Sequence, residues 1–323
     1  MEITSRQLIN QVFELKAVPR VPVGFWFHFL AEERFGCGTG SFFSENVRGH
    51  RRFIETFKPD MVKIMSDGFF NYPSKRVSDN PADMLGSLDT VTANHPWIRD
   101  QVRLVEAVRA LQDDTSYFYN VFSPATTLRF MIGREALLKW LKEYPLESQK
   151  LLNEMSRGLT VLATEVISQG RADGVYFSVQ NPDLNNFSDD DYLKFLFQGE
   201  IDLLNEANLS GGQNILHICG YAGVKNNLPF YANYPAQAFS WAVNVENVSL
   251  KTGQKLFGGK AVIGGFPNIR GSIIHTGQKE EIEAFTRKIL EETGRIGVII
   301  GADCTVPSDI DLEHLNWVRE AAK

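Results

Sequence analysis

The sequence predicts an α/β fold: a single (β/α)8 TIM barrel with an N-terminal helix, formed by residues 1–323. Eight short apolar segments recur along the chain, and helical patterns separate them. The segments are apolar throughout rather than alternating, as in parallel strands that are buried on both faces. A length of 323 residues fits one such barrel. An open doubly wound sheet is the alternative, because hydrophobic periodicity does not report whether a sheet closes.

The predicted strands are rich in β-branched and aromatic residues and are bounded by Gly, Pro, Asn or Asp. They cover residues 21–29, 61–66, 117–122, 174–179, 214–219, 238–243, 261–266 and 297–302.

The helices are predicted from capping residues and from apolar residues at helical spacing. Thr4 and Gln7 form the pattern of a capping box, which predicts a first helix with Leu8, Val12 and Leu15 on one face. The later predicted helices cover residues 45–57, with Ser44 as the N-cap, and residues 99–111, 134–144, 147–168, 189–207, 246–255, 279–293 and 311–322.

Charge and composition argue against two classes of partner. The net charge is -6 and no run of basic residues is present, so we expect no nucleic-acid partner. No apolar stretch reaches the roughly 18 residues of a membrane span, and the first residues lack the pattern of an export signal. We therefore expect a cytoplasmic protein without a membrane anchor. Reduced thiols are then expected at Cys37, Cys219 and Cys304, which favours metal binding or catalysis over disulfides.

The main candidate site consists of His217, Cys219 and Cys304. His217 and Cys219 lie two residues apart on one predicted strand and therefore share a face. Cys304 follows the last predicted strand, and in a barrel the carboxyl ends of all strands meet at one mouth. One imidazole and two thiolates suit zinc and leave a fourth position for water or substrate. From spacing alone, a core histidine with two inert thiols explains the pattern equally well.

Polar residues at other strand ends are further candidates. His28 and Asp67 end the first two predicted strands, so we expect them to be catalytic, in proton transfer or substrate orientation. Gln180 and Asn181 follow the fourth predicted strand and are candidates for hydrogen bonding to a substrate. The alternative for all four is a structural role, as satisfied polar residues or loop caps.

Aromatic residues crowd the predicted mouth of the barrel. Trp26 in the first predicted strand and Phe177 in the fourth are candidate substrate-binding residues. Some of these rings must belong to the core, but alternation along a strand would aim others into an apolar pocket. Such a pocket would suit a flat or methylated small-molecule substrate.

Three segments resemble the uroporphyrinogen decarboxylase superfamily. They are GRIGVIIGADCTVPSDIDLEHL at 294–315, HICG at 217–220 and VFSPATTLRFMIG at 121–133. The first two are most similar to the superfamily's branch of zinc-dependent methyltransferases that act with corrinoids. The resemblance implies the barrel fold, zinc at His217, Cys219 and Cys304, and methyl transfer between a corrinoid and a small thiol or a methylated ether or amine. Because this chain has no corrinoid-binding motif of its own, a separate corrinoid protein is the implied partner.

The sequence departs from the decarboxylases of this superfamily in one place. They carry an arginine-rich stretch after the first strand that binds the carboxylates of the tetrapyrrole, whereas residues 25–30 read FWFHFL here. Without guanidinium groups at that place, tetrapyrrole carboxylates would lose their bidentate partners. Decarboxylation of uroporphyrinogen is therefore the second hypothesis, for which Asp67 matches the position after the second strand. A third is a non-enzymatic protein that binds a corrinoid or porphyrin in the barrel mouth.

Overall fold

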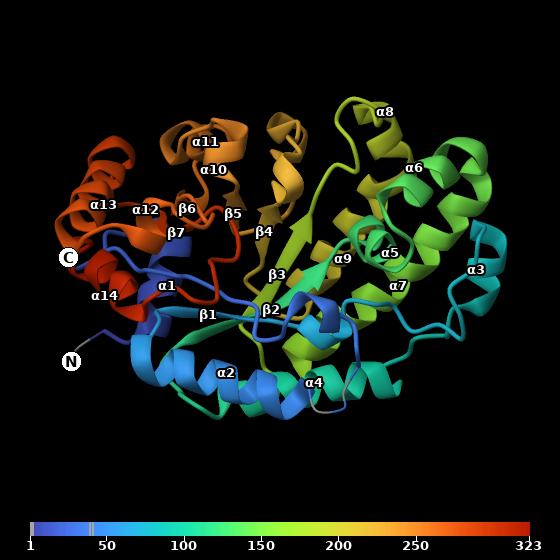
Figure 1. Ribbon diagram of the computed structural model, residues 1–323, viewed down its shortest axis with the longest axis horizontal. Coiled ribbons are helices and arrows are strands. Elements are labelled where there is room, and N and C mark those ends of the chain that lie inside the picture. The colour runs from blue at the N-terminus through green and yellow to red at the C-terminus, as the bar shows by residue number, and fades with distance from the viewer. Residues whose placement is uncertain (1–2, 39, 41) are drawn as a thin grey trace.

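The sheet has seven parallel strands that follow one another in space in their order along the chain. The computed structural model describes residues 3–38, 40 and 42–323. The sheet is curled, and helices cover its outer face (Figure 1). These strands confirm seven of the predicted ones, with ends that shift by up to two residues. They are β1 (Met61–Ile64), β2 (Ser116–Phe122), β3 (Gly174–Val179), β4 (Ile215–Ile218), β5 (Ala238–Trp241), β6 (Ala261–Phe266) and β7 (Val298–Ala302).

The strand predicted at residues 21–29 is wrong. In this segment Val23 makes only an isolated parallel bridge to Ile300 of β7. Gly24 donates its N–H to the Ile300 carbonyl at 2.9 Å, and a Cβ added to Gly24 would lie 2.7 Å from Met61 Cγ on β1. The segment therefore lies between β7 and β1. No ladder joins it to β1 in the described part of the chain, so the strands do not form a complete eight-stranded barrel.

Two carboxylates explain why this segment is not a strand. Asp60, just before β1, accepts a hydrogen bond from the backbone N–H of Val23 at 2.9 Å. Asp67, just after β1, accepts one from the N–H of Phe29 at 2.7 Å. Side chains thus satisfy backbone donors that a ladder would otherwise use. The apolar composition of the segment reports its burial, and it does not report which partner its backbone has.

The helices pack outside the sheet, with α7 against β2 and β3 and with α14 against α2 (Figure 1). The helices are α1 (Ser5–Phe13), α2 (Phe42–Phe57), α3 (Pro81–Ser87), α4 (Pro96–Arg109), α5 (Pro124–Ile132), α6 (Arg134–Glu143), α7 (Pro145–Ser168), α8 (Asp189–Tyr192), α9 (Gln198–Leu209), α10 (Val243–Glu246), α11 (Leu250–Leu256), α12 (Ile273–Thr276), α13 (Lys279–Thr293) and α14 (Leu312–Ala321).

The ends of the helices agree with the sequence prediction at some positions and differ from it at others. The predicted capping box is confirmed, since Thr4 accepts from the N–H of Gln7 and the Gln7 side chain accepts from the N–H of Thr4. Ser44 lies inside α2 rather than capping it. The helix predicted at 246–255 is split into α10 and α11, because Asn247 is in the left-handed region with φ 55°. A π-helical turn, Leu193–Phe197, joins α8 to α9.

The apolar residues form two cores, one on each face of the sheet. The outer core lies between the strands and the helices and is the larger of the two. The inner core fills the space inside the curled sheet and is closed at its amino end by Ile9 and Val12 of α1. Its other members come mainly from alternate strand positions, so they identify which residues point inward. They are Trp26, Met61, Met65, Phe118, Tyr176, Ile215, Ala238, Ala261, Ile263 and Ile299.

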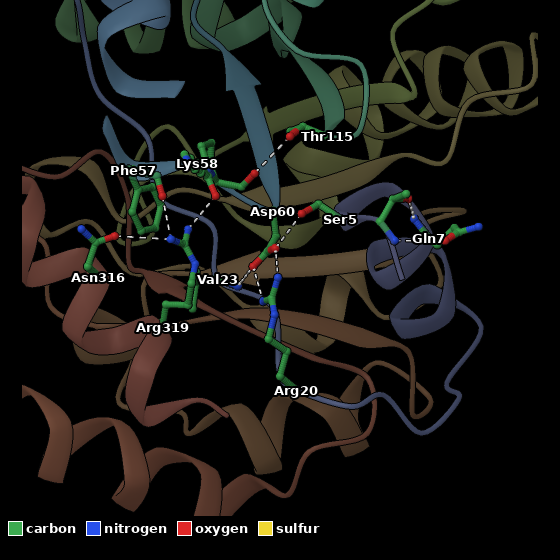
Figure 2. A network of polar contacts seen from close by, with 12 residues as sticks. Ser5, Gln7, Arg20, Val23, Phe57, Lys58, Asp60, Thr115, Asn316 and Arg319 are labelled. Carbon is green, nitrogen blue, oxygen red and sulfur yellow. Dashed lines mark hydrogen bonds and ion pairs between the residues drawn. The ribbon is translucent and has the colours of Figure 1, made fainter. Parts of the chain in front are cut away.

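A polar network holds the amino end of β1 (Figure 2). Asp60 is buried and accepts both guanidinium branches of Arg20, the hydroxyl of Ser5 at 2.9 Å, and the N–H of Val23. Arg319 of α14 donates to the carbonyls of Phe57 and Lys58 at 2.6 and 2.7 Å. The network therefore ties the N-terminal segment and the last helix to the same turn before β1.

A helix must be both long and apolar to cross a membrane, and no helix in the described part of the chain combines the two properties.

Candidate metal centre

The structure brings the three predicted metal ligands together. His217 lies on β4, Cys219 follows β4 directly, and Cys304 follows β7. Hydrogen bonds fix both strand ends, since the N–H of Cys219 donates to the carbonyl of Val179 at 2.8 Å and the N–H of Asp303 donates to that of Phe266 at 2.8 Å. One ligand atom from each of the three side chains lies within 4.8 Å of the others. This convergence depends on the curl of the sheet, because β4 and β7 are not neighbours.

The imidazole of His217 has one nitrogen engaged and one without a partner. Nδ1 lies 3.1 Å from Ser240 Oγ and 3.5 Å from the hydroxyl of Tyr176, and β-sheet register places Ser240 directly beside His217. Nε2 is buried and has no hydrogen-bond partner among the described residues. Burial lowers the pKa of His217, which favours the neutral imidazole that ligates metals. A buried nitrogen left unpaired costs free energy, and a metal ion at Nε2 would remove that cost.

The two cysteine side chains shift each other's pKa in opposite directions. The hydrogen bond from Cys219 lowers the pKa of Cys304 well below its ordinary value. The same hydrogen bond, together with burial, raises the pKa of Cys219. A divalent cation between the sulfurs would deprotonate both thiols. One neutral imidazole and two thiolates are a set that zinc prefers, so the residues present fit zinc with one position left for another ligand.

A cavity of about 560 Å³ opens above this cluster. Its wall combines aromatic rings with a larger number of polar and charged side chains. The polar and charged lining residues besides the cluster include His28, Glu32, Lys63, Asn71, Thr126, Arg129, Arg134, Ser178, Gln180 and Thr305, and the aromatic ones are Phe35, Phe70, Phe122, Phe130 and Tyr221.

The two predicted catalytic residues lie in contact but face different surroundings. His28 lines the cavity, and its Nδ1 lies 2.8 Å from Asp67 Oδ1. Asp67 is fully buried behind it, and its other oxygen accepts the N–H groups of Phe29 and Leu30 at 2.7 and 3.2 Å. Asp67 is not part of the cavity wall, and its contact with His28 holds that ring beside the cavity. The catalytic role of the two residues stays a prediction.

Gln180 and Asn181 also differ in their placement. Gln180 lines the cavity, accepts a hydrogen bond from Arg129, and donates to the Tyr221 carbonyl at 2.8 Å. Asn181 lies off the wall, and its side chain donates to the carbonyl of Phe187 and accepts the N–H of Asp183. The predicted substrate contact stays a prediction for Gln180, whereas the contacts of Asn181 brace the loop after β3.

The two predicted aromatic contacts do not lie on the cavity wall. Trp26 lies in the inner core beneath the cluster, with its ring 5.0 Å from that of Tyr176 and 6.1 Å from that of His217. Phe177 points to the other face of β3 and is buried in the outer core. Its neighbours Tyr176 and Ser178 point inward instead. An apolar strand without alternation does not reveal which of its two faces is the inner one.

Lys63 and Arg129 are residues of the cavity that the sequence analysis missed. Lys63 is the inward-facing residue between Met61 and Met65 on β1, and burial lowers its pKa to about 8. Arg129 on α5 packs its guanidinium 5.5 Å from the ring of Tyr221, and burial lowers its pKa. A lysine inside the apolar run MVKIMS was the available signal for Lys63. Arg129 lies within VFSPATTLRFMIG and carried no separate signal.

Residues 72–323 match the protein family described as Uroporphyrinogen decarboxylase (URO-D). The chain belongs to the uroporphyrinogen decarboxylase family. The matched region includes His217, Cys219 and Cys304 and begins after the segment that supplies His28 and Lys63. No curated protein sequence matches this family member.

Solved structures with the same fold include two proteins of methyl-group metabolism. A methyltransferase from Methanosarcina mazei is similar with a TM-score of 0.72 and 16% identity, over 99% of this chain and 98% of that one. A B12-independent methionine synthase from Shewanella sp. W3-18-1 is similar with a TM-score of 0.56 and 13% identity, over 94% of this chain and 97% of that one. At these identities the similarity concerns the fold of this uroporphyrinogen decarboxylase family member.

Proposed function

We propose that this protein is a zinc-dependent methyltransferase that moves a methyl group between a corrinoid and a small thiol or a methylated ether or amine. The observation that carries the proposal is the unpartnered Nε2 of buried His217, which lies with the sulfurs of Cys219 and Cys304 beneath the cavity. The likeness in fold to a methyltransferase from Methanosarcina mazei supports it. The similarity of HICG at 217–220 and of residues 294–315 to the branch of corrinoid-dependent methyltransferases supports it as well.

The residues of the site would have three separate roles in this reaction. His217, Cys219 and Cys304 would hold the metal, which supplies Lewis acidity toward a substrate heteroatom in its fourth position. The aromatic rings of the wall, including Phe35, Phe70 and Phe130, would exclude water from the methyl group. His28 would take or give the proton of the substrate heteroatom, and Asp67 would keep its ring oriented.

A separate corrinoid protein is part of this proposal, because the sequence contains no corrinoid-binding motif. That protein would present its corrinoid at the mouth of the cavity. A cytoplasmic location is also part of it, because both thiol ligands must stay reduced to bind metal.

Metal analysis of purified protein tests the proposal. We expect about one zinc per chain, and we expect Cys219→Ala and Cys304→Ala each to lose it because two ligands hold the ion poorly. Cys37→Ala is the matched control, because Cys37 is an exposed cysteine outside the cluster. Full zinc retention in both ligand variants would contradict the proposal. Methyl transfer from methylcobalamin to a thiol, abolished by a chelator, would complete the test.

Uroporphyrinogen decarboxylation is the second candidate. The observation that favours it is that Arg129 and Arg134 both line the cavity, and guanidinium groups pair well with carboxylates. This candidate predicts that metal-free protein consumes uroporphyrinogen and that Asp67→Ala stops the reaction. Turnover that resists chelators would favour it over methyl transfer.

A further inference from the structure

We propose that Lys63 is the charge partner of the thiolate ligands and that it selects an anionic over a neutral ligand for the metal's open position. The inference rests on the proposed metal site and adds to it a residue that determines which class of substrate heteroatom binds.

The position of Lys63 is fixed by the strand that carries it. It lies on β1 between Met61 and Met65, whose side chains belong to the inner core, so alternation directs Lys63 into the same interior. The residue is 5% exposed and lines the cavity that also contains Cys219 and Cys304. The long stem of the lysine thus carries its ammonium group from the inner core to the floor of the site.

The ammonium group of Lys63 contacts aromatic faces instead of oxygen acceptors. Its Nζ lies 4.2 Å from the ring centroid of Tyr176 and 5.3 Å from that of Trp26. No carboxylate, carbonyl or hydroxyl among the described residues accepts a hydrogen bond from it. Attraction to two aromatic faces offsets part of the free energy that burying an ammonium costs, and negative charge nearby would offset the rest. The negative charges that would act on it are those of Cys304 and Cys219 as thiolates and, behind them in size, that of Asp67.

Counting charges gives the direction of the selection. A divalent ion with two thiolates and a neutral imidazole has no net charge. The ammonium of Lys63 adds one positive charge, which an anionic fourth ligand neutralises and a neutral one leaves uncompensated. A thiolate is therefore bound in preference to an ether or an amine. Arg129 and Arg134 also line the cavity but are only partly buried, and Arg129 donates to Gln180.

Cobalt(II) in place of zinc makes the open position observable, because its visible absorption changes when a ligand binds. Azide is the anionic probe and imidazole the neutral one. We expect Lys63→Met to weaken azide binding by about ten- to a hundredfold, the effect of one unit charge several ångströms away at an effective dielectric constant of about 20. Imidazole binding should change by less than about threefold, since it carries no charge to lose.

Methionine has a similar length and is apolar, so Lys63→Met suits the inner core. Lys63→Gln is the second neutral variant, with the same expected loss, if the first does not fold. Lys260→Met is the matched control: Lys260 is also partly buried beside a ring, that of Phe239, but it precedes β6 at the opposite end of the sheet. It should leave both probes unchanged.

The outcomes separate this inference from the proposed function. Cobalt that binds equally well to wild type and to Cys304→Ala would overturn the metal site itself. Suppose that cobalt binding requires Cys304 but azide binds equally well to the cobalt-loaded wild type and Lys63→Met. That result would overturn the role of Lys63 alone. Equal weakening of azide and imidazole would also overturn it, because that result describes a distorted site rather than a lost charge.

Discussion

The two ends of β1 carry buried aspartates with opposite surroundings. At the amino end, Asp60 has both oxygens occupied by Arg20, Ser5 and a backbone N–H (Figure 2). At the carboxyl end, Asp67 has one side-chain partner among the described residues, His28, which faces the cavity. One carboxylate therefore fastens three segments of the chain together, and the other holds a side chain at the site.

The same contrast extends to neighbouring strand ends. Three buried polar atoms without a partner among the described residues lie near the carboxyl ends of the strands, at His217 Nε2, Ser178 Oγ and Asp303 Oδ1, although others lie elsewhere, as at Ser116 Oγ on the amino end of β2. Barrel-like folds place stability at the amino ends of the strands and chemistry at the carboxyl ends. A buried aspartate therefore has a structural or a site-directed role according to its partners, and the residue type alone does not tell the two apart.

The largest expected effect is that of Asp60→Ala on stability. Removing this carboxylate leaves the partly buried guanidinium of Arg20 without its ion pair and the N–H of Val23 without an acceptor. We expect the free energy of unfolding to fall by about 3–5 kcal/mol. Urea unfolding measures this free energy. We expect the zinc content of the folded protein to stay unchanged. A loss below about 1 kcal/mol would remove the contrast between the two ends.

We expect Asp67→Asn to reduce stability less than Asp60→Ala does and to reduce methyl transfer more. The amide oxygen still accepts one backbone N–H, so we expect a loss of about 1–3 kcal/mol. The amide no longer offers a carboxylate to His28, and methyl transfer should fall at least about tenfold if His28 moves the proton. Equal methyl-transfer rates with unchanged pH dependence would show that Asp67 is structural, like Asp60.

A third buried carboxyl, Glu200 on α9, sharpens the comparison because no cation reaches it among the described residues. It accepts hydrogen bonds from the hydroxyls of Tyr192 and Tyr234, and burial raises its pKa to about 8. The folded state then keeps a proton that the unfolded chain loses at lower pH, so stability falls as pH rises from about 4.5 to about 8.

Replacing Glu200 by Gln removes that titration. The stability of Glu200→Gln relative to wild type should rise by up to about 1.4 kcal/mol per pH unit across this window. Urea midpoints of both proteins at about pH 5 and about pH 7.5 measure the difference. A difference that does not depend on pH would show that Glu200 is already ionised in the folded state.

The smallest effect on stability is expected for Ser240→Ala. The hydroxyl of Ser240 holds Nδ1 of His217, so its removal frees the ring to turn Nε2 away from the sulfurs. We expect zinc affinity to fall by about 10- to 100-fold, as for other residues that orient metal-binding histidines, with about 0.5–1.5 kcal/mol lost in stability. Competition with a chromophoric chelator measures the affinity.

Ser178→Ala is the matched control for this variant. Ser178 flanks His217 on the other neighbouring strand, but its buried hydroxyl has no hydrogen-bond partner among the described residues. Its removal should leave zinc affinity within about threefold of wild type. An equal loss in both variants would show that the polarity of the pocket matters and that the contact to Nδ1 does not.

The local pattern of apolar and capping residues in the sequence determined much of the secondary structure of this protein. Seven strands and most long helices follow from hydrophobic period and caps, and the convergence of His217, Cys219 and Cys304 follows from placing them at strand ends. These features depend on residues close together in the chain, or on the rule that parallel strands end at one edge.

Only the tertiary structure decided the rest. The segment at 21–29 has the composition of a strand, but carboxylates on either side of β1 take its backbone donors. Tyr176 rather than Phe177 points inward, Ser240 contacts His217, and Lys63 reaches the site through the inner core. Each of these depends on strand register and on which face of an apolar strand is the inner one, and a strand buried on both faces carries no alternation from which to read it.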